Sequence, residues 1–142
     1  MTLRVQVNAL VDAPGALVEP AVLATLRDAG LGEASVSVTL MDDPAIADLN
    51  DVYLDRTGPT DVIAFALHDD DEPPLGDIYI GVDRAGAEAK ERGIPLAHEL
   101  ARLAIHGTLH VLGHEHPDEE RESSDMWRLQ ERLLQVVLEE AR

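Results

Sequence analysis

The segment HGTLHVLGHEH, from His106 to His116, holds four of the six histidines in the chain. His106 and His110 are four residues apart, a spacing that places both side chains on one face of a helix. Gly113 follows where such a helix would end in the left-handed turn that favours glycine. The chain can then turn back and bring His116 to the pair. The segment therefore predicts a helix that carries a metal site at its C-terminal end.

Three imidazole ligands leave one coordination position open, which is the arrangement of a catalytic zinc site and not of a closed structural one. The chain has no cysteine, so thiolate ligands are excluded and histidine is the remaining strong ligand for a borderline metal. We therefore expect one Zn²⁺ per chain, held by His106, His110 and His116. The spacing alone leaves open whether His114 takes the place of His116.

The spacing H-x3-H-x2-G-x2-H also occurs in metzincin proteases, which carry a glutamate directly after the first histidine as general base. This chain has Gly107 at that position, which argues against a peptidase. His98 lies two turns before His106, too far to share one ion, and is interpreted as a surface or packing residue.

The composition indicates one globular domain spanning residues 1–142, with 45% hydrophobic residues. The N-terminal segment has no signal-peptide pattern and no apolar run is long enough to span a membrane, so we expect a soluble cytoplasmic protein without a membrane partner. The net charge of −17, from 28 acidic and 11 basic residues, is unusual for a protein that binds nucleic acid. A polyanion would need a local basic strip, for which the middle of the chain offers Arg56, Arg84, Lys90, Arg92 and Arg102.

Hydrophobic periodicity predicts an α+β fold, in which a mixed four-stranded sheet is packed by about five helices. Apolar residues alternate with polar ones near residues 3–7 and 36–40, and two short apolar runs at 61–67 and 75–82 indicate further strands, the first of them buried. Helices are expected at 16–29, from Asp42 or Asp43 onward, and at 83–92, 95–112 and 118–141. In the second of these helices, Ile46, Leu49 and Tyr53 are expected to point inward.

With these motifs in place, the chain resembles the YbeY family of bacterial rRNA maturation factors. HGTLHVLGHEH is similar to the family signature HGxLHLxGYDH. Upstream, Leu49–Asn50, Pro59–Val62 and Phe65 match the family's LN…PTDVLSF stretch, and Leu75–Ile78 matches its LGDI strand. The similarity covers roughly residues 35 to 130, with the motifs in the same order.

The resemblance implies a metal-dependent, single-strand-specific endoribonuclease that acts in 3′-end maturation of small-subunit rRNA and in ribosome quality control. Its implied partners are single-stranded rRNA, the small ribosomal subunit and assembly factors. The implied ligands are His106, His110 and His116, usually of zinc. One position departs from the family pattern: an arginine follows the aromatic residue of the family's LNxxYR segment, whereas Leu54 follows Tyr53 here and the nearest base is Arg56.

For the chemistry, we expect the ion to activate water and to neutralise charge on the phosphoryl oxygens during attack. Arg56 is the candidate for a second counter-charge, and Glu115 for a group that orients a ligand or transfers a proton. Asp77 is a further candidate, or a strand-end carboxylate that binds the backbone. Two alternatives stay open: a ribosome-assembly binding factor with a structural metal and no cleavage activity, and a hydrolase of some small substrate.

Overall fold

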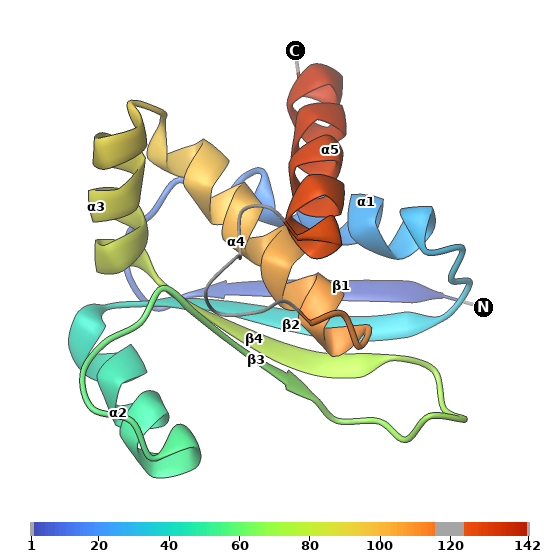
Figure 1. Ribbon diagram of the computed structural model, residues 1–142, viewed down its shortest axis with the longest axis horizontal. Coiled ribbons are helices and arrows are strands. Elements are labelled where there is room, and N and C mark those ends of the chain that lie inside the picture. Colours follow the sequence, from blue (N-terminus) through green and yellow to red (C-terminus); the bar gives the residue numbers. More distant parts are fainter. Residues whose placement is uncertain (1, 116–123, 142) are drawn as a thin grey trace.

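A four-stranded mixed sheet forms the base of the fold, as Figure 1 shows for this computed structural model, which describes residues 2–115 and 124–141. The strands are β1 (Leu3–Ala9), β2 (Ala34–Met41), β3 (Val62–Ala66) and β4 (Leu75–Gly81), arranged in the order β1-β2-β4-β3. β1 is parallel to β2 and β2 is parallel to β4, whereas β3 is antiparallel to β4. The predicted mixed four-stranded sheet is therefore confirmed.

Side-chain alternation divides the sheet into an apolar face and a more polar one. In β2, the buried residues Val36, Val38 and Leu40 alternate with half-buried Ser and Thr residues. One side of the sheet is covered by α1 (Val18–Asp28), α3 (Val82–Arg92), α4 (Leu96–Val111) and α5 (Asp125–Glu140), as Figure 1 shows. None of the helices in the described ranges is long and apolar enough to cross a membrane.

The central helix is α4, which packs against β3 and β4 below it and against α1, α3 and α5 around it. Its side chains Leu100, Leu103, Ile105 and Leu109 are buried in the core. Gly107 allows the close approach of helix and sheet, because a Cβ atom added there would lie 2.7 Å from the Cγ2 atom of Ile78 in β4. The helix that carries the histidine pair is thus fixed directly on the sheet.

Helix α2 (Asp43–Leu54) lies on the opposite side of the sheet from the other helices (Figure 1). The predicted start is confirmed, since the side chain of Asp42 caps the helix by accepting from the N–H of Ala45 at 3.0 Å. The inward orientation predicted for Tyr53 is wrong. Its side chain is 65% exposed, because α2 buries only the side that carries Ile46 and Asn50.

The strand expected to be buried, β3, is an edge strand in which Ile63 alone is buried. Among the described strands it pairs only with β4. Its apolar run reflects packing on both faces, since Val62 and Ala64 pack against the main core whereas Ile63 packs with Ile46 of α2. Helix α5 begins at Asp125, where the hydroxyl of Ser124 accepts from the N–H of Trp127 at 3.1 Å. The earlier start predicted for this helix, at residue 118, lies outside the described residues.

Candidate metal centre

The two histidines predicted to share a helix face do so at the C-terminal end of α4. Their Nε2 atoms are 3.1 Å apart, and their rings meet edge to face with centroids 4.6 Å apart. His106 is only 4% exposed, whereas His110 is half-buried. The pair therefore has one imidazole held in the core and one that reaches toward solvent.

The separation of the two Nε2 atoms fits two ligands of one ion. Two nitrogens at about 2.0–2.1 Å from a tetrahedral zinc ion lie about 3.3 Å apart, close to the observed 3.1 Å. Within residues 2–115 and 124–141, no three potential ligand side chains form a group that could hold a metal ion. The third predicted ligand, His116, lies outside these residues.

The turn predicted after the histidine pair is present at Gly113, whose φ angle is +97°. Its N–H donates to the carbonyl of His110 at 3.0 Å, and the N–H of His114 donates to the carbonyl of Leu109 at 2.9 Å. These bonds close the last turn of α4 and redirect the chain. His114 and Glu115 follow as exposed residues, so Glu115 stands near the end of the helix and in solvent.

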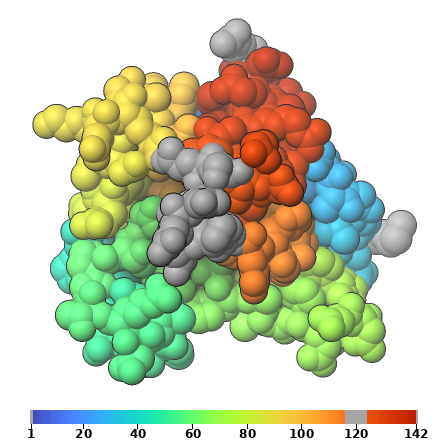
Figure 2. Space-filling model, in the orientation of Figure 1, coloured from blue at the N-terminus to red at the C-terminus, as the bar shows by residue number. Residues whose placement is uncertain are grey.

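A hollow of about 350 Å³ opens beside the pair, between α4, the edge strand β3 and the end of α2. We call it the histidine hollow; it is lined by Leu54, Val62, Ile63, Ala64, Ala66, His106 and His110. Figure 2 shows the end of α4 (orange) reaching the surface between α5 (red) and the β3–β4 region (yellow-green). Leu54, which stands where the family pattern has arginine, is 39% exposed there.

A second hollow of about 200 Å³ lies on the other side of His106 and is polar. We call it the polar hollow; it is lined by Asp61, Glu88, Arg92, Glu99, Arg102, Leu103, His106, Trp127 and Gln130. His106 is the residue that the two hollows share. His106 thus lies between a recess at the sheet edge, lined mostly by aliphatic residues, and a charged recess between α3, α4 and α5.

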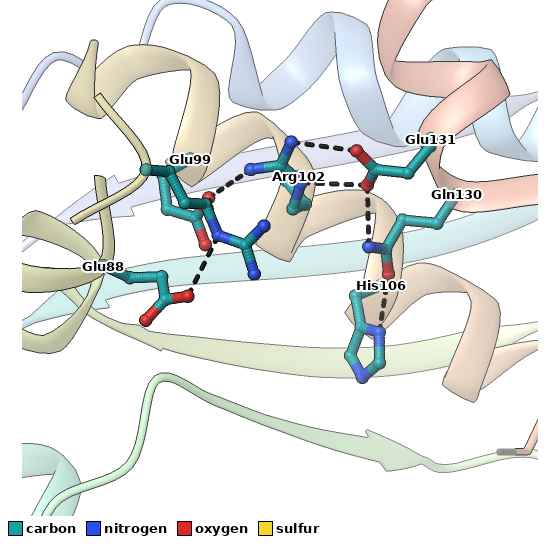
Figure 3. A network of polar contacts seen from close by, with 7 residues as sticks. Glu88, Glu99, Arg102, His106, Gln130 and Glu131 are labelled. Atoms are coloured by element: carbon teal, nitrogen blue, oxygen red, sulfur yellow. Dashed lines mark hydrogen bonds and ion pairs between the residues drawn. The ribbon is translucent and has the colours of Figure 1, made fainter. Parts of the chain in front are cut away.

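The polar hollow contains ion pairs within and between helices, as Figure 3 shows. Arg102 of α4 donates from Nε and Nη2 to the two carboxylate oxygens of Glu131 in α5, both at 2.9 Å, and from Nη1 to Glu99. Arg92 of α3 binds Glu88 at 2.9 Å, and its guanidinium lies 5.5 Å from the ring centroid of Trp127. Two bases of the predicted basic strip are therefore engaged by acids.

The two carboxylates that share Arg102 respond to it in opposite ways. Burial raises the pKa of Glu99 by more than the hydrogen bond and charge of Arg102 lower it. Burial also acts to raise the pKa of Glu131, but the hydrogen bonds from Arg102 and Gln130, together with the charge of Arg102, leave the pKa below its ordinary value. Glu131 is thus the carboxylate that Arg102 holds ionised.

The site residue that sequence reasoning missed is Gln130, on the buried face of α5. Its Oε1 atom is 2.7 Å from Nδ1 of His106, and its side chain is 1% exposed. The signal was present in the helix pattern, because a polar residue interrupts an otherwise apolar face. The apolar members of that face are Met126, Leu133, Leu134 and Val137.

The two predicted catalytic side chains do not line either hollow. Arg56 follows α2 with an exposed side chain, and its backbone N–H donates to the carbonyl of Asn50 at 3.2 Å. Glu115 is exposed beyond Gly113. Asp77 lies within β4 on the face opposite to Ile78, which is the face away from α4. Within the described residues, the structure therefore brings together His106 and His110 but not Arg56, Asp77 or Glu115.

Comparison with known proteins gives one consistent family. The family described as "Endoribonuclease YbeY" matches residues 11–137. A protein of that name from Moorella thermoacetica is 47% identical over 117 residues, covering 75% of this chain and 74% of the relative. The relative from Synechococcus sp. strain CC9605 is 46% identical over 109 residues, which cover 72% of this chain and 65% of that protein. The chain thus spans slightly less than two thirds of the Synechococcus relative.

The fold agrees with a solved structure. The solution structure of TM1509 from Thermotoga maritima superposes with a TM-score of 0.69 at 26% sequence identity. The alignment covers 99% of this chain and 92% of that chain. The arrangement of sheet and helices described above is therefore shared over the whole length of this chain.

Proposed function

The chain belongs to the YbeY family of endoribonucleases, and on that premise we propose that it is a zinc-dependent endoribonuclease that cleaves single-stranded RNA. The observation that carries the proposal is the pair of Nε2 atoms 3.1 Å apart at the wall of an open hollow. His106 and His110 would hold one zinc ion per chain, with His116 as the third ligand. The histidine hollow beside the pair would give a substrate access to that ion.

The residues around the pair support this chemistry by holding two ligands rigidly. His106 is buried and His110 is anchored by the same helix, which packs on β3 and β4. A bound zinc ion supplies a Lewis acid that polarises a phosphoryl oxygen and lowers the pKa of water. The preorganised donors are what the protein contributes to that step.

An RNA substrate does not require the general-base glutamate that a metzincin protease needs. Gly107 stands where a metzincin carries its glutamate, and a side chain there would collide with Ile78. RNA brings its own nucleophile, the 2′-hydroxyl group, and its alkoxide leaving group needs less protonation than an amine. We assign the counter-charge to Arg56 and proton transfer to Glu115, two exposed residues that RNA would have to reach from outside the hollow.

The substrate we propose is the single-stranded 3′ region of small-subunit rRNA, in the cytoplasm and in the company of the small subunit or its assembly factors. The net charge of −17 supports a need for such partners, because free RNA is repelled by an acidic protein. A ribosomal surface rich in cations would supply the attraction that this chain lacks.

The test compares cleavage of a single-stranded RNA oligonucleotide by zinc-loaded parent protein and by His110→Ala. We expect about one zinc ion per chain in the parent, and loss of both zinc and cleavage in the variant. The matched control is His98→Ala, which removes an imidazole from the same helix outside both hollows and should leave both quantities unchanged. Equal cleavage by the parent and His110→Ala would assign it to a contaminant and favour the assembly factor that cleaves nothing.

A further inference from the structure

Gln130 has contacts on both ends of its side-chain amide, and these contacts join α4 to α5. Oε1 lies 2.7 Å from Nδ1 of His106, and Nε2 donates to Oε2 of Glu131 at 3.1 Å. Both Gln130 and His106 are almost fully buried, at 1% and 4% exposed. The amide therefore connects a metal-ligand candidate with the ion pair of the polar hollow (Figure 3).

The orientation of the amide is determined by Glu131. Arg102 binds both carboxylate oxygens of Glu131 at 2.9 Å, and the pKa of Glu131 is held below its ordinary value. An ionised carboxylate can only accept hydrogen bonds, so it must face the NH₂ group of Gln130 and not the carbonyl oxygen. The carbonyl oxygen is thereby directed at His106.

We infer that Gln130 is a positioning residue that fixes His106 in the tautomer with the proton on Nδ1. A carbonyl oxygen can only accept, so Nδ1 must donate to it, and Nε2 of the neutral imidazole then keeps its lone pair. That lone pair points at His110, on the side where the proposed zinc site lies. The inference rests on the proposed function, which it deepens by naming the group that prepares His106 as a ligand.

The tautomer of His106 also determines which imidazole carries the proton between the two rings. Nε2 of His106 carries a lone pair and lies 3.1 Å from Nε2 of His110, so His110 is the donor of that contact in the metal-free protein. An ion held by both Nε2 atoms would require the other tautomer of His110 but no change at His106. The two histidines thus differ in role although they lie on one helix face.

The test measures zinc affinity by competition with a chromophoric chelator, and tautomers by long-range ¹H–¹⁵N spectra of the zinc-free protein. Gln130→Met removes the acceptor, so zinc should bind about 10- to 100-fold more weakly, and His106 should no longer be held with its proton on Nδ1. Gln130→Glu keeps an oxygen acceptor for His106 but loses the donor to Glu131. We expect it to retain zinc affinity within about threefold of the parent while lowering the melting temperature.

The matched control is Gln135→Met, the same substitution at an exposed position of α5. It should change neither zinc affinity nor the spectra of His106. The inference is overturned if the zinc-free parent carries the His106 proton on Nε2, or if Gln130→Met binds zinc as tightly as the parent while folded by circular dichroism. If Gln130→Met fails to fold, the parent spectrum and Gln130→Glu decide the question: a Gln130→Glu protein that binds zinc as weakly as His110→Ala contradicts the proposed role.

Failure of the inference can be told apart from failure of the proposed function. If the parent binds no zinc, or binds it and cleaves no RNA, the proposed function is wrong whatever Gln130 does. If the parent binds zinc and cleaves RNA but the Gln130 variants match it in zinc affinity, only the positioning role is wrong.

Discussion

At the residue scale, Arg102 is a single cation shared by two carboxylates with opposite pKa shifts. Glu99 is 2% exposed and has a raised pKa because burial outweighs the attraction of Arg102. Glu131 has a lowered pKa because its two hydrogen bonds with Arg102 and one with Gln130 help outweigh burial. The polar network behind His106 therefore contains one acid that is costly to ionise and one that is stabilised as an anion.

These shifts predict opposite pH dependences for two variants. The unfolded-state pKa of Glu99 is near 4.5. Because the folded-state pKa is higher, the contribution of Glu99 to stability is fully present at pH values below 4.5 and is lost as pH rises through the folded pKa. Glu99→Gln cannot ionise, so its stability relative to the parent should rise with pH from about 4.5 upward. A lowered folded pKa stabilises the protein at pH values above the unfolded pKa, and that contribution is lost as pH falls through the folded pKa. The free energy of unfolding of Glu131→Gln relative to the parent should therefore fall as pH rises toward and past 4.5.

Urea unfolding of zinc-free parent and variants, repeated at several pH values, measures both trends. The two variants serve as each other's control, because each removes one carboxylate from the same guanidinium. Slopes of the same sign in the two variants would contradict the division of roles between Glu99 and Glu131.

For single residues, the sequence predicts local geometry but not contacts between distant parts of the chain. The face shared by His106 and His110 and the turn at Gly113 were predictable, because both depend on local helix geometry. The contact of Gln130 with His106 was not, since it joins residues 24 apart in the chain through the packing of two helices. The inward orientation of Tyr53 failed for a similar reason: periodicity gives a face but not the partner that would cover it.

At the element scale, α4 depends on a glycine for its distance from the sheet. A Cβ atom at position 107 would lie 2.7 Å from Cγ2 of Ile78, a branch atom next to the backbone that has little freedom to move. Gly86, in the middle of α3, has no atom within 4 Å of the corresponding position. The two glycines are therefore a matched pair, one required by packing and one not.

We expect Gly107→Ala to destabilise the protein and Gly86→Ala to stabilise it. Alanine gains about 1 kcal/mol over glycine within a helix, and this gain should appear at position 86. At position 107, overpacking costs about 1–3 kcal/mol and should offset or exceed the gain. Thermal unfolding of the two variants beside the parent measures the difference, and equal stabilisation at both positions would contradict the close contact with Ile78.

Most elements were predictable because each has a local signal. The alternation of apolar and polar residues predicted β1 and β2, and a capping Asp42 followed by Pro44 predicted the start of α2. The edge position of β3 was not predictable from its apolar run, because the same run suits a central strand or an edge strand covered by a helix. Strand order depends on which elements pair across the chain, and no local pattern specifies that.

At the scale of the whole molecule, charge is the property least suited to an RNA substrate. The chain has 28 acidic and 11 basic residues, and Arg92 and Arg102 are already engaged in ion pairs with acids. Leu54 lines the histidine hollow at the position where the family pattern has arginine. RNA approaching the site therefore meets a long-range repulsion and an apolar side chain at the position where a cation would help.

This predicts an inverted salt dependence of cleavage. The range of the repulsion falls from about 30 Å at 0.01 M salt to about 10 Å at 0.1 M. We therefore expect kcat/KM for a short single-stranded RNA to rise across that interval at constant zinc. Proteins that bind nucleic acid through many cation–phosphate contacts show the reverse trend, and a steep fall here would reveal a basic path to the site.

Leu54→Arg distinguishes the effect of a charge in the histidine hollow from the effect of the net charge of the whole protein. Because Leu54 lines the histidine hollow, an arginine there should add one exposed ion pair with a phosphate, raising kcat/KM about two- to fivefold at low salt, as expected for about 0.4–1 kcal/mol. Val52→Arg adds the same charge to the same helix at a position that is 70% exposed and outside the hollow. Its effect should be smaller, because it changes only the distant field. Equal gains from the two arginines would mean that RNA does not pass Leu54 on its way to the histidine pair.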